Sequence, residues 1–148
     1  MNDDEAMRLA LQEAEGAIQH EDVPVGALVI IDGVVVASRH NERQLTGDPS
    51  AHAEILALRD AASHLGTWHL DNSTLVTTLE PCPMCAGAAL NARVAHVIFG
   101  AHDPKAGAVE TLYNLLDDPR LNHQTKITSG VLAAACGDIL SQFFAQRR

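Results

Sequence analysis

The first twenty residues carry apolar side chains at helical spacing, at Met7, Leu11, Ala14 and Ile18. A period of three to four residues places these side chains on one stripe of a helix. The pattern therefore predicts an amphipathic N-terminal helix that packs against a flat surface, such as a sheet.

Two apolar, β-branched runs follow, from Val25 to Ile31 and from Val34 to Ser38, with Asp32-Gly33 between them. That dipeptide accepts the positive φ angles of a tight hairpin turn, so the two runs are predicted to be paired strands. Because the runs are continuous rather than alternating, we expect both strands to be covered on both faces.

The rest of the chain alternates helical and extended patterns. A polar stretch over 39–48 precedes a helix that is marked by Ile55, Leu58 and Ala62 and closes near Gly66. The further expected elements are strands over 73–78, 94–100 and 125–128, and helices over 82–91, from the loop 101–107 to Leu115, and over 131–146. This alternation predicts an α/β fold, a three-layer α/β/α sandwich with a central sheet between helical layers.

A chain of 148 residues is expected to form a single domain, residues 1–148, around one core. The acidic N-terminus does not resemble a signal peptide, and no apolar run approaches the ~20 residues that span a bilayer. We therefore expect a soluble, cytoplasmic protein that does not bind membranes.

The net charge of −9 argues against broad contact with nucleic acid, and no DNA binding is expected. The acidity is concentrated at the N-terminus, where residues 1–22 hold seven acids and one base. Residues 93–148 hold six bases and five acids, so a local basic rim near a functional site remains compatible with the sequence.

The most informative motif pairs His52-Ala53-Glu54 with the downstream segment Pro81-Cys82-Pro83-Met84-Cys85. A catalytic zinc ion takes three nitrogen or sulfur ligands from the protein and keeps one position for water. His52, Cys82 and Cys85 supply those three ligands, one zinc ion per subunit. Both halves of the motif fall at expected helix starts, so two helix N-termini are predicted to converge on the metal and to favour thiolate over thiol.

The remaining groups divide into a proton carrier and a core residue. Glu54 is left over for proton transfer between the activated water, the substrate and the leaving group. Cys136 falls on an apolar helical stripe with Leu132, Ile139 and Phe143, so we interpret it as a core residue rather than a fourth ligand. Simpler interpretations remain open: Cys82 and Cys85 could form a redox dithiol or a structural zinc site, and Glu54 could be a solvated first-turn acid.

The His-x-Glu and Pro-Cys-x-x-Cys motifs resemble the signature of the cytidine and adenosine deaminase superfamily. Within it, the chain resembles the bacterial tRNA-specific adenosine deaminases over essentially its whole length. The stretches that carry this resemblance include Val23-Pro24-Val25-Gly26-Ala27, Arg39-His40-Asn41, Thr78-Leu79-Glu80-Pro81-Cys82, Asp103-Pro104-Lys105-Ala106-Gly107-Ala108 and Phe143-Phe144 with Arg147-Arg148.

The resemblance implies a mixed five-stranded sheet and zinc-dependent hydrolysis of adenosine to inosine at the wobble position of a tRNA anticodon, a loop base that can be splayed into a pocket. It also implies a homodimer. By matching position, Asn41 contacts the base edge, Asp103 the ribose hydroxyl, Phe144 the flipped loop nucleotides, and Lys105, Arg147 and Arg148 the RNA backbone. Structural alternatives stay open for three of them: Asn41 as a turn residue, Asp103 as a loop starter and Phe144 as core.

Two other functions compete with this one. The first is a zinc deaminase of a free base or nucleoside, such as guanine, cytosine or cytidine, which the acidic composition favours. The second is a structural zinc module that binds a partner and has no enzymatic activity. Ala145-Gln146 follow Phe144 where the resembled family often carries bases, which thins the basic tail.

Overall fold

The computed structural model describes residues 1–147, so Arg148 lies outside the described residues. The elements in chain order are α1 (Asp3–Ile18), β1 (Gly26–Ile31), β2 (Val34–His40), α2 (Arg43–Thr46), α3 (Ala53–Leu65), β3 (Ser73–Leu79), α4 (Pro83–Asn91), β4 (His96–Ala101), β5 (Lys126–Thr128) and α5 (Ala133–Ala145). The predicted hairpin turn is confirmed, with positive φ at both Asp32 and Gly33.

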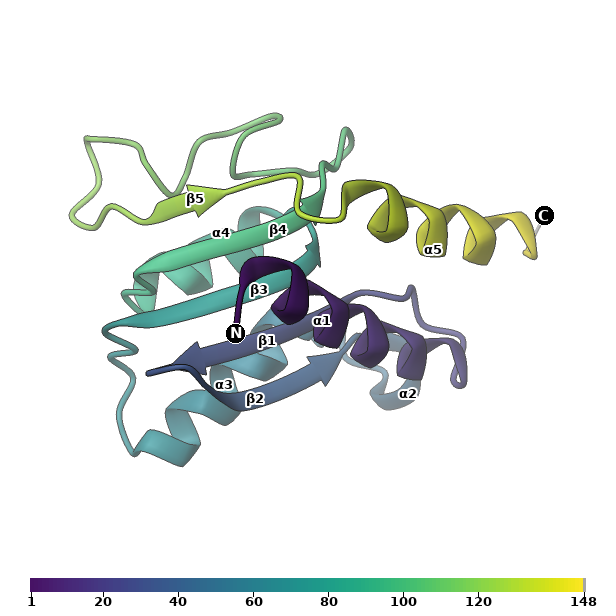
Figure 1. Ribbon diagram of the computed structural model, residues 1–148, viewed down its shortest axis with the longest axis horizontal. Helices are drawn as coiled ribbons and strands as arrows, with labels where there is room; N and C mark the ends of the chain where they lie inside the picture. The colour runs from purple at the N-terminus through teal and green to yellow at the C-terminus, as the bar shows by residue number, and fades with distance from the viewer. Residues whose placement is uncertain (148) are drawn as a thin grey trace.

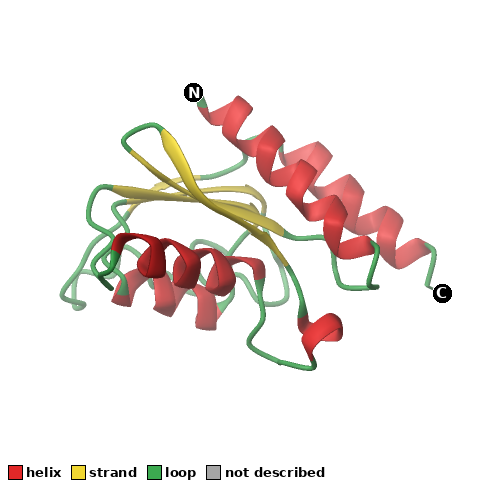
Figure 2. Cartoon of the chain, turned by 90° about the horizontal axis from the view of Figure 1, so that it is seen from below, coloured by secondary structure: helices red, strands yellow, loops and turns green. Residues whose placement is uncertain are grey.

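The five strands form one mixed sheet in the order β2-β1-β3-β4-β5 (Figure 1). Strand β1 is antiparallel to both β2 and β3, whereas β3, β4 and β5 run parallel to one another. Helices α1 and α5 cover one face of the sheet, and α3 and α4 cover the other (Figure 2). The predicted three-layer sandwich is therefore confirmed.

Successive residues of β1 point into two separate hydrophobic cores, one on each face of the sheet. Ala27 and Val29 of β1 lie in the core that α3 and α4 cover, whereas Leu28 packs in the core beneath α1 together with Met7 and Ala10. This alternation follows from the two-residue period of a strand. It explains why β1 is apolar at every position.

One expectation about the elements holds only in part, and another is wrong. Residues of β2 pack in the cores on both faces of the sheet, but Val34 at the start of this edge strand is 60% exposed, so its coverage is incomplete. No helix ends near Leu115; residues 104–106 and 108–111 form turns instead. The backbone N–H groups that would continue a helix there bond to the carboxylate of Glu80.

Helix α5 docks on β4 through a close contact. A Cβ atom built on Gly100 would lie 2.3 Å from the Sγ atom of Cys136 and 2.9 Å from the carbonyl oxygen of Thr78. Cys136 is fully buried, and burial raises the pKa of its thiol to about 11. The expected core role of Cys136 is confirmed, and glycine is needed opposite it.

The chain brings three segments to one edge of the sheet. The carboxyl end of β3 leads directly into Glu80-Pro81-Cys82, and the carboxyl end of β4 leads into the loop that begins at His102. Antiparallel β1 starts at the same edge, where the N–H of Gly26 donates to the hydroxyl of Thr78. Open α/β sheets bind ligands outside the carboxyl ends of their strands, and this edge fits that rule.

Among the described residues, no helix has both the length and the apolar character needed to cross a membrane.

Candidate active site

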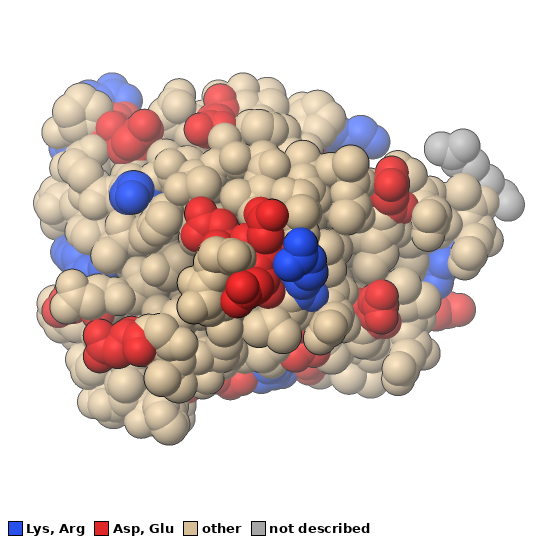
Figure 3. All heavy atoms as spheres, viewed as in Figure 1, with Lys and Arg blue, Asp and Glu red and all other residues tan. Residues whose placement is uncertain are grey.

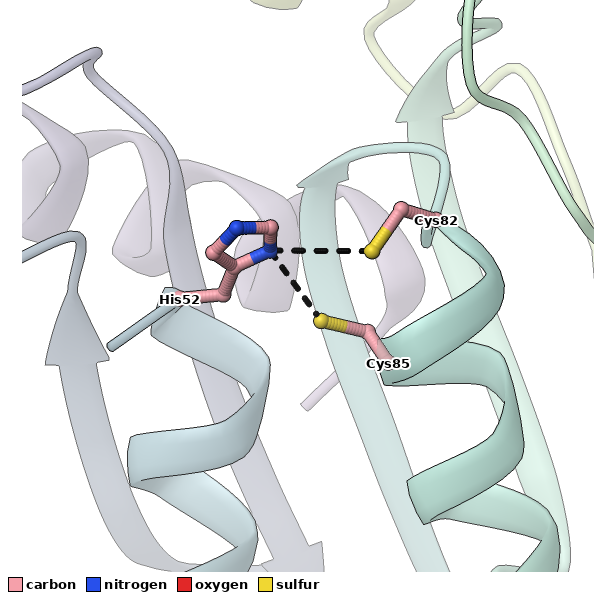
Figure 4. A group of neighbouring side chains, drawn as sticks. All are labelled: His52, Cys82 and Cys85. Atoms are coloured by element: carbon pink, nitrogen blue, oxygen red, sulfur yellow. Dashed lines mark hydrogen bonds between the residues drawn. The ribbon is translucent and has the colours of Figure 1, made fainter. Parts of the chain in front are cut away.

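The three predicted metal ligands meet where two helices begin. His52 is the residue before α3, Cys82 is the residue before α4, and Cys85 lies in the first turn of α4. The Nδ1 atom of His52 is 3.6 Å from the Sγ atom of Cys82 and 3.4 Å from that of Cys85 (Figure 4). The ligand atoms of all three residues lie within 4.8 Å of one another.

This geometry suits a tetrahedral metal ion. Bonds of about 2.0 Å to nitrogen and about 2.3 Å to sulfur place a nitrogen and a sulfur ligand roughly 3.5 Å apart. One imidazole and two thiolates also form a donor set typical of zinc. Within residues 1–147 no other His, Cys, Asp or Glu side chain joins this group, so the protein supplies three ligands and leaves a fourth position.

The electrostatics of the two cysteines favour a cation. The hydrogen bond with Cys85 and the neighbouring His52 lower the pKa of the Cys82 thiol to about 4, against the opposing effect of burial. The hydrogen bond with Cys82 and burial raise the pKa of Cys85 above its usual value. The second thiol holds its proton because the first is charged, and a cation between them allows both to be thiolates.

Glu54 lies in the first turn of α3 and is only 4% exposed. Burial raises the pKa of its carboxyl above the usual value. A carboxyl whose pKa is shifted toward neutrality can both accept and return a proton. Glu54 lines the same cleft as His52 and Cys82, which is the position required of a proton carrier.

That cleft has a volume of about 800 Å³ and reaches from the ligands to α5. Residues that lie far apart in the sequence line the cleft. Four of them were predicted to contact the substrate: Asn41, Asp103, Lys105 and Phe144. This volume exceeds that of a single base, so the cleft can admit a nucleoside together with neighbouring groups.

Asn41 is buried and already holds two parts of the site together. Its Nδ2 donates to the carbonyl oxygen of Val23 at 3.0 Å, and its Oδ1 accepts the N–H of Ala53 at 2.8 Å. The second bond satisfies a free donor in the first turn of α3, directly beside His52. One further donor and one acceptor site of the amide remain for a ligand.

Asp103 forms a turn at the start of its loop. Its Oδ1 accepts the N–H groups of Lys105 and Ala106, at 2.9 and 3.2 Å. The Oδ1 atom of Asp103 therefore has the structural role expected of a residue that starts a loop. Its Oδ2 makes no hydrogen bond within residues 1–147 and is left for a ligand.

Helix α5 forms the far wall of the cleft through Leu140, Ser141 and Phe144. Phe144 is 48% exposed, whereas Phe143 is buried, so the alternative of Phe144 as a core residue is wrong. Arg147 does not line the cleft; its guanidinium lies over the Phe143 ring at 3.6 Å and donates to the Phe143 carbonyl oxygen. Arg148 lies outside the described residues.

One residue of the site had no role predicted from the sequence. Glu80 is buried and lines the cleft, and its carboxylate accepts hydrogen bonds from Asp103, Val109, Glu110 and Thr111. Burial alone would raise its pKa, but the hydrogen bonds outweigh it and lower the pKa to about 2. A charged residue directly before Pro81-Cys82 was the only signal that the sequence offered.

The fold and site have clear relatives. A family model described as MafB19-like deaminase matches residues 1–148. The tRNA-specific adenosine deaminase of Bacillus subtilis (strain 168) is 49% identical over 142 residues, covering 96% of this chain and 88% of that protein. The tRNA-specific adenosine deaminase of Haemophilus influenzae is 44% identical over 147 residues, covering 99% and 85%.

Solved structures of deaminases also superpose on this chain. A chain from a study of A-to-I editing by tRNA:A34 deaminases at the wobble position superposes with a TM-score of 0.88 at 40% identity, covering 92% of this chain and 99% of that chain. A guanine deaminase from Nitrosomonas europaea superposes with a TM-score of 0.79 at 27% identity, covering 96% and 84%.

The sandwich fold, the His-Cys-Cys group and the buried glutamate beside it define a hydrolytic deaminase. The chain belongs to the MafB19-like deaminases and, among them, to the family of tRNA-specific adenosine deaminases. The family resemblance found in the sequence is thereby confirmed.

Proposed function

We propose that this protein is a zinc-dependent deaminase that hydrolyses adenosine to inosine at the wobble position of tRNA anticodons. The observation that carries the proposal is the placement of Glu54 beside His52, Cys82 and Cys85 along one cleft. Its relatives named as tRNA-specific adenosine deaminases reach 49% identity and support adenosine in tRNA as the substrate.

His52, Cys82 and Cys85 would hold the zinc ion. When bound, zinc supplies a Lewis acid that makes water acidic enough to act as a nucleophile at neutral pH. Glu54 takes a proton from the attacking water and delivers it to the ring nitrogen next to C6 of the adenine. Glu54 then transfers the proton of the hydroxyl group added at C6 to the amino group. One water is consumed, ammonia leaves, and the adenine base becomes hypoxanthine.

The other cleft residues would orient the nucleotide. The remaining hydrogen-bonding positions of Asn41 would contact the edge of the base. The Oδ2 atom of Asp103 would accept a hydrogen bond from the ribose 2′-hydroxyl. Lys105, Arg147 and Arg148 are assigned to phosphates, and the exposed ring of Phe144 to stacking with a neighbouring loop base.

The net charge of −9 does not oppose RNA binding at this cleft. The first turn of α1 holds Asp3, Asp4 and Glu5, and acidic side chains gather over the start of α1 on the face shown in Figure 3. At the cleft, Arg43 and Lys105 accompany Asp103, while Glu54 and Glu80 are buried. The acidic surface and the proposed RNA surface are therefore different parts of the molecule.

We propose a homodimer on the family likeness alone, and a cytoplasmic protein because that is where a tRNA substrate would be met. Sedimentation of the purified protein at micromolar concentration tests the first, since a monomer at all concentrations contradicts it.

A zinc-dependent deaminase of a free base or nucleoside, such as guanine, cytosine or cytidine, is the second candidate. It is favoured by the likeness to the Nitrosomonas europaea guanine deaminase, at 27% identity, but the higher identity to the tRNA-specific enzymes favours RNA. The deciding assay measures ammonia and inosine from an anticodon stem-loop with adenosine at the wobble position, in parallel with free guanine and cytidine. Turnover of guanine or cytidine, with none on the RNA, would overturn the proposal.

A further inference from the structure

The Glu80 carboxylate is the centre around which the loop from Asp103 to Thr111 folds. Its Oε1 accepts the N–H of Asp103 at 3.0 Å and the hydroxyl of Thr111. Its Oε2 accepts three successive N–H groups, from Val109, Glu110 and Thr111, at 3.1, 2.8 and 3.0 Å. All five donors come from this one loop.

No Lys, Arg or His side chain of residues 1–147 forms an ion pair with Glu80, although the residue is only 2% exposed. A buried carboxylate without a cation is costly unless several hydrogen bonds satisfy it. Oriented backbone N–H groups can take that role in place of a cation. The carboxylate and the loop conformation therefore depend on each other.

The loop closes tightly on the carboxylate. A Cβ atom built on Gly107 would lie 2.3 Å from the Oε1 atom of Glu80 and 2.7 Å from the carbonyl oxygen of Asp103. The N–H of Ala108 donates to the carbonyl oxygen of Pro81 at 2.9 Å, which fixes the loop to the segment before Cys82. A side chain at position 107 would push the loop off Glu80.

The same loop carries two groups to the cleft, Asp103 and Lys105. The N–H of Asp103 is held by Glu80, and the Oδ1 of Asp103 in turn holds the N–H of Lys105. The position of both side chains at the cleft thus follows from the carboxylate beneath them.

We propose that Glu80 is a positioning residue for RNA recognition, which acts by holding Asp103 and Lys105 in the geometry that engages the ribose and phosphate of the substrate. This inference rests on the proposed function. Glu80 lies two residues before Cys82, so its effect on RNA must be separated from any effect on the metal ligands.

A double-mutant cycle makes that separation. The zinc-loaded Glu80→Gln variant retains the volume of the side chain but turns an amide toward the loop N–H groups. We expect its KM for the anticodon stem-loop to rise about tenfold, with kcat and zinc content close to those of the wild type. In an Asp103→Ala, Lys105→Ala background, Glu80→Gln should raise KM no further, because the groups that it positions are gone.

Equal rises in KM in both backgrounds would show that Glu80 does not act through Asp103 and Lys105. A loss of zinc, or a fall in kcat at unchanged KM, would likewise overturn the inference. If Glu80→Gln does not fold, Thr111→Val takes its place in the double-mutant cycle, because it removes one of the five hydrogen bonds to the Glu80 carboxylate. Thr111→Ser, which keeps the hydroxyl, should restore the wild-type KM.

Asp22 offers a matched control. It is 1% exposed, and its carboxylate accepts the N–H groups of Gln44 and Leu45 and lies 2.6 Å from the Nδ1 atom of His20, away from the loop. Asp22→Asn therefore removes the charge of another buried carboxylate that holds backbone N–H groups. Its effect on KM should be the same in the wild type and in the Asp103→Ala, Lys105→Ala background.

Hydrogen exchange separates a failure of this inference from a failure of the proposed function. In the protein without RNA, Glu80→Gln should accelerate exchange at the amides of Asp103, Val109, Glu110 and Thr111, whatever the substrate is. Unchanged exchange at these four amides contradicts the positioning role. If exchange is accelerated but the wild-type protein does not act on RNA, Glu80 still holds the loop. The proposed function is then refuted and, with it, the assignment of the loop to RNA.

Discussion

The Nδ1 atom of His52 lies 3.4 Å from the Sγ atom of Cys85, although 33 positions separate the two residues in the chain. The contact exists because α3 and α4 begin at the same edge of the sheet, with His52 and Cys82 as the residues before them. The N-terminus of each helix carries a partial positive charge that stabilises nearby thiolates. The fold therefore places both cysteines at the N-terminus of α4, where the thiolate form is favoured.

Glu54→Ala should abolish deamination while leaving zinc in place, because we propose proton transfer as its role and it is not one of the three residues of the metal group. A general acid-base residue contributes about a hundredfold to ten-thousandfold in rate. The measurements are inosine formation on the anticodon stem-loop and zinc content by elemental analysis. A variant that retains full activity would refute the role assigned to Glu54, and one that loses zinc would show that Glu54 supports the metal instead.

Removal of zinc with a chelator should expose one reactive thiol, at Cys82. In this structure Cys82 is partly exposed, whereas Cys85 and Cys136 are fully buried. The pKa of Cys136 is about 11, so only about one thiol in a thousand is ionised at pH 8. Alkylation followed by peptide mass analysis should find Cys82 modified first and Cys136 only after unfolding. Fast alkylation of Cys136 in the folded protein would contradict its burial.

Asn41→Ala should affect both stability and substrate binding. It removes the acceptor of the N–H of Ala53, the residue after His52, and the donor to the Val23 carbonyl oxygen. Leaving a buried polar group without its partner costs about 1–3 kcal/mol of the free energy of unfolding. Denaturant unfolding of the zinc-loaded protein measures this loss. A rise in KM with unchanged stability would mean that the amide serves only the base.

Gly100→Ala should destabilise the docking of α5. The added Cβ would lie 2.3 Å from the Sγ of Cys136, and overpacking of this kind costs about 1–3 kcal/mol. Cys136→Ala should relieve part of that cost in the double variant, because the Cβ of Cys136 and the Thr78 carbonyl oxygen remain close at 2.9 Å. Unfolding free energies of the two single variants and the double variant test this, and strictly additive losses would contradict the contact.

Arg147→Ala should weaken RNA binding in a salt-dependent way. Arg147 follows the end of α5, with its guanidinium over the Phe143 ring. One lost phosphate contact lowers the slope of log Kd against log salt by about 0.7 for a single strand. Titration of a fluorescent stem-loop into the Glu54→Ala protein at several salt concentrations gives that slope. Gln142→Ala, a change on the same helix, is the control and should leave the slope unchanged.

The metal ligands and the sheet could be predicted from the sequence because their signals are local. His52 and Glu54 stand at one helix start, Cys82 and Cys85 at another, and β1, β2 and β4 each contain an unbroken apolar run. The loop after β4 could not be predicted. The partners of Glu80 lie 23 to 31 positions away, and a helix was expected where the turns around its carboxylate are found.

The substrate contacts are intermediate between these cases. Asn41, Asp103, Lys105 and Phe144 were assigned from a family resemblance, and all four line one cleft. The turn at Asp103 had a local signal, since the sequence already allowed Asp103 as a loop starter. The bonds of Asn41 had none, because they depend on backbone groups whose orientation only the folded chain defines. The partial exposure of β2 had none either, since an apolar run does not reveal whether a strand lies at the edge of a sheet.

Helix α5 contributes a wall of the cleft but no ligand to the metal group. The helix is also the last element of the described chain, and its Cys136 packs against Gly100 of β4. This wall of the cleft and the metal group are therefore encoded in separate stretches of sequence. A change in the terminal helix would reshape the cleft while the residues around the metal group stay unchanged.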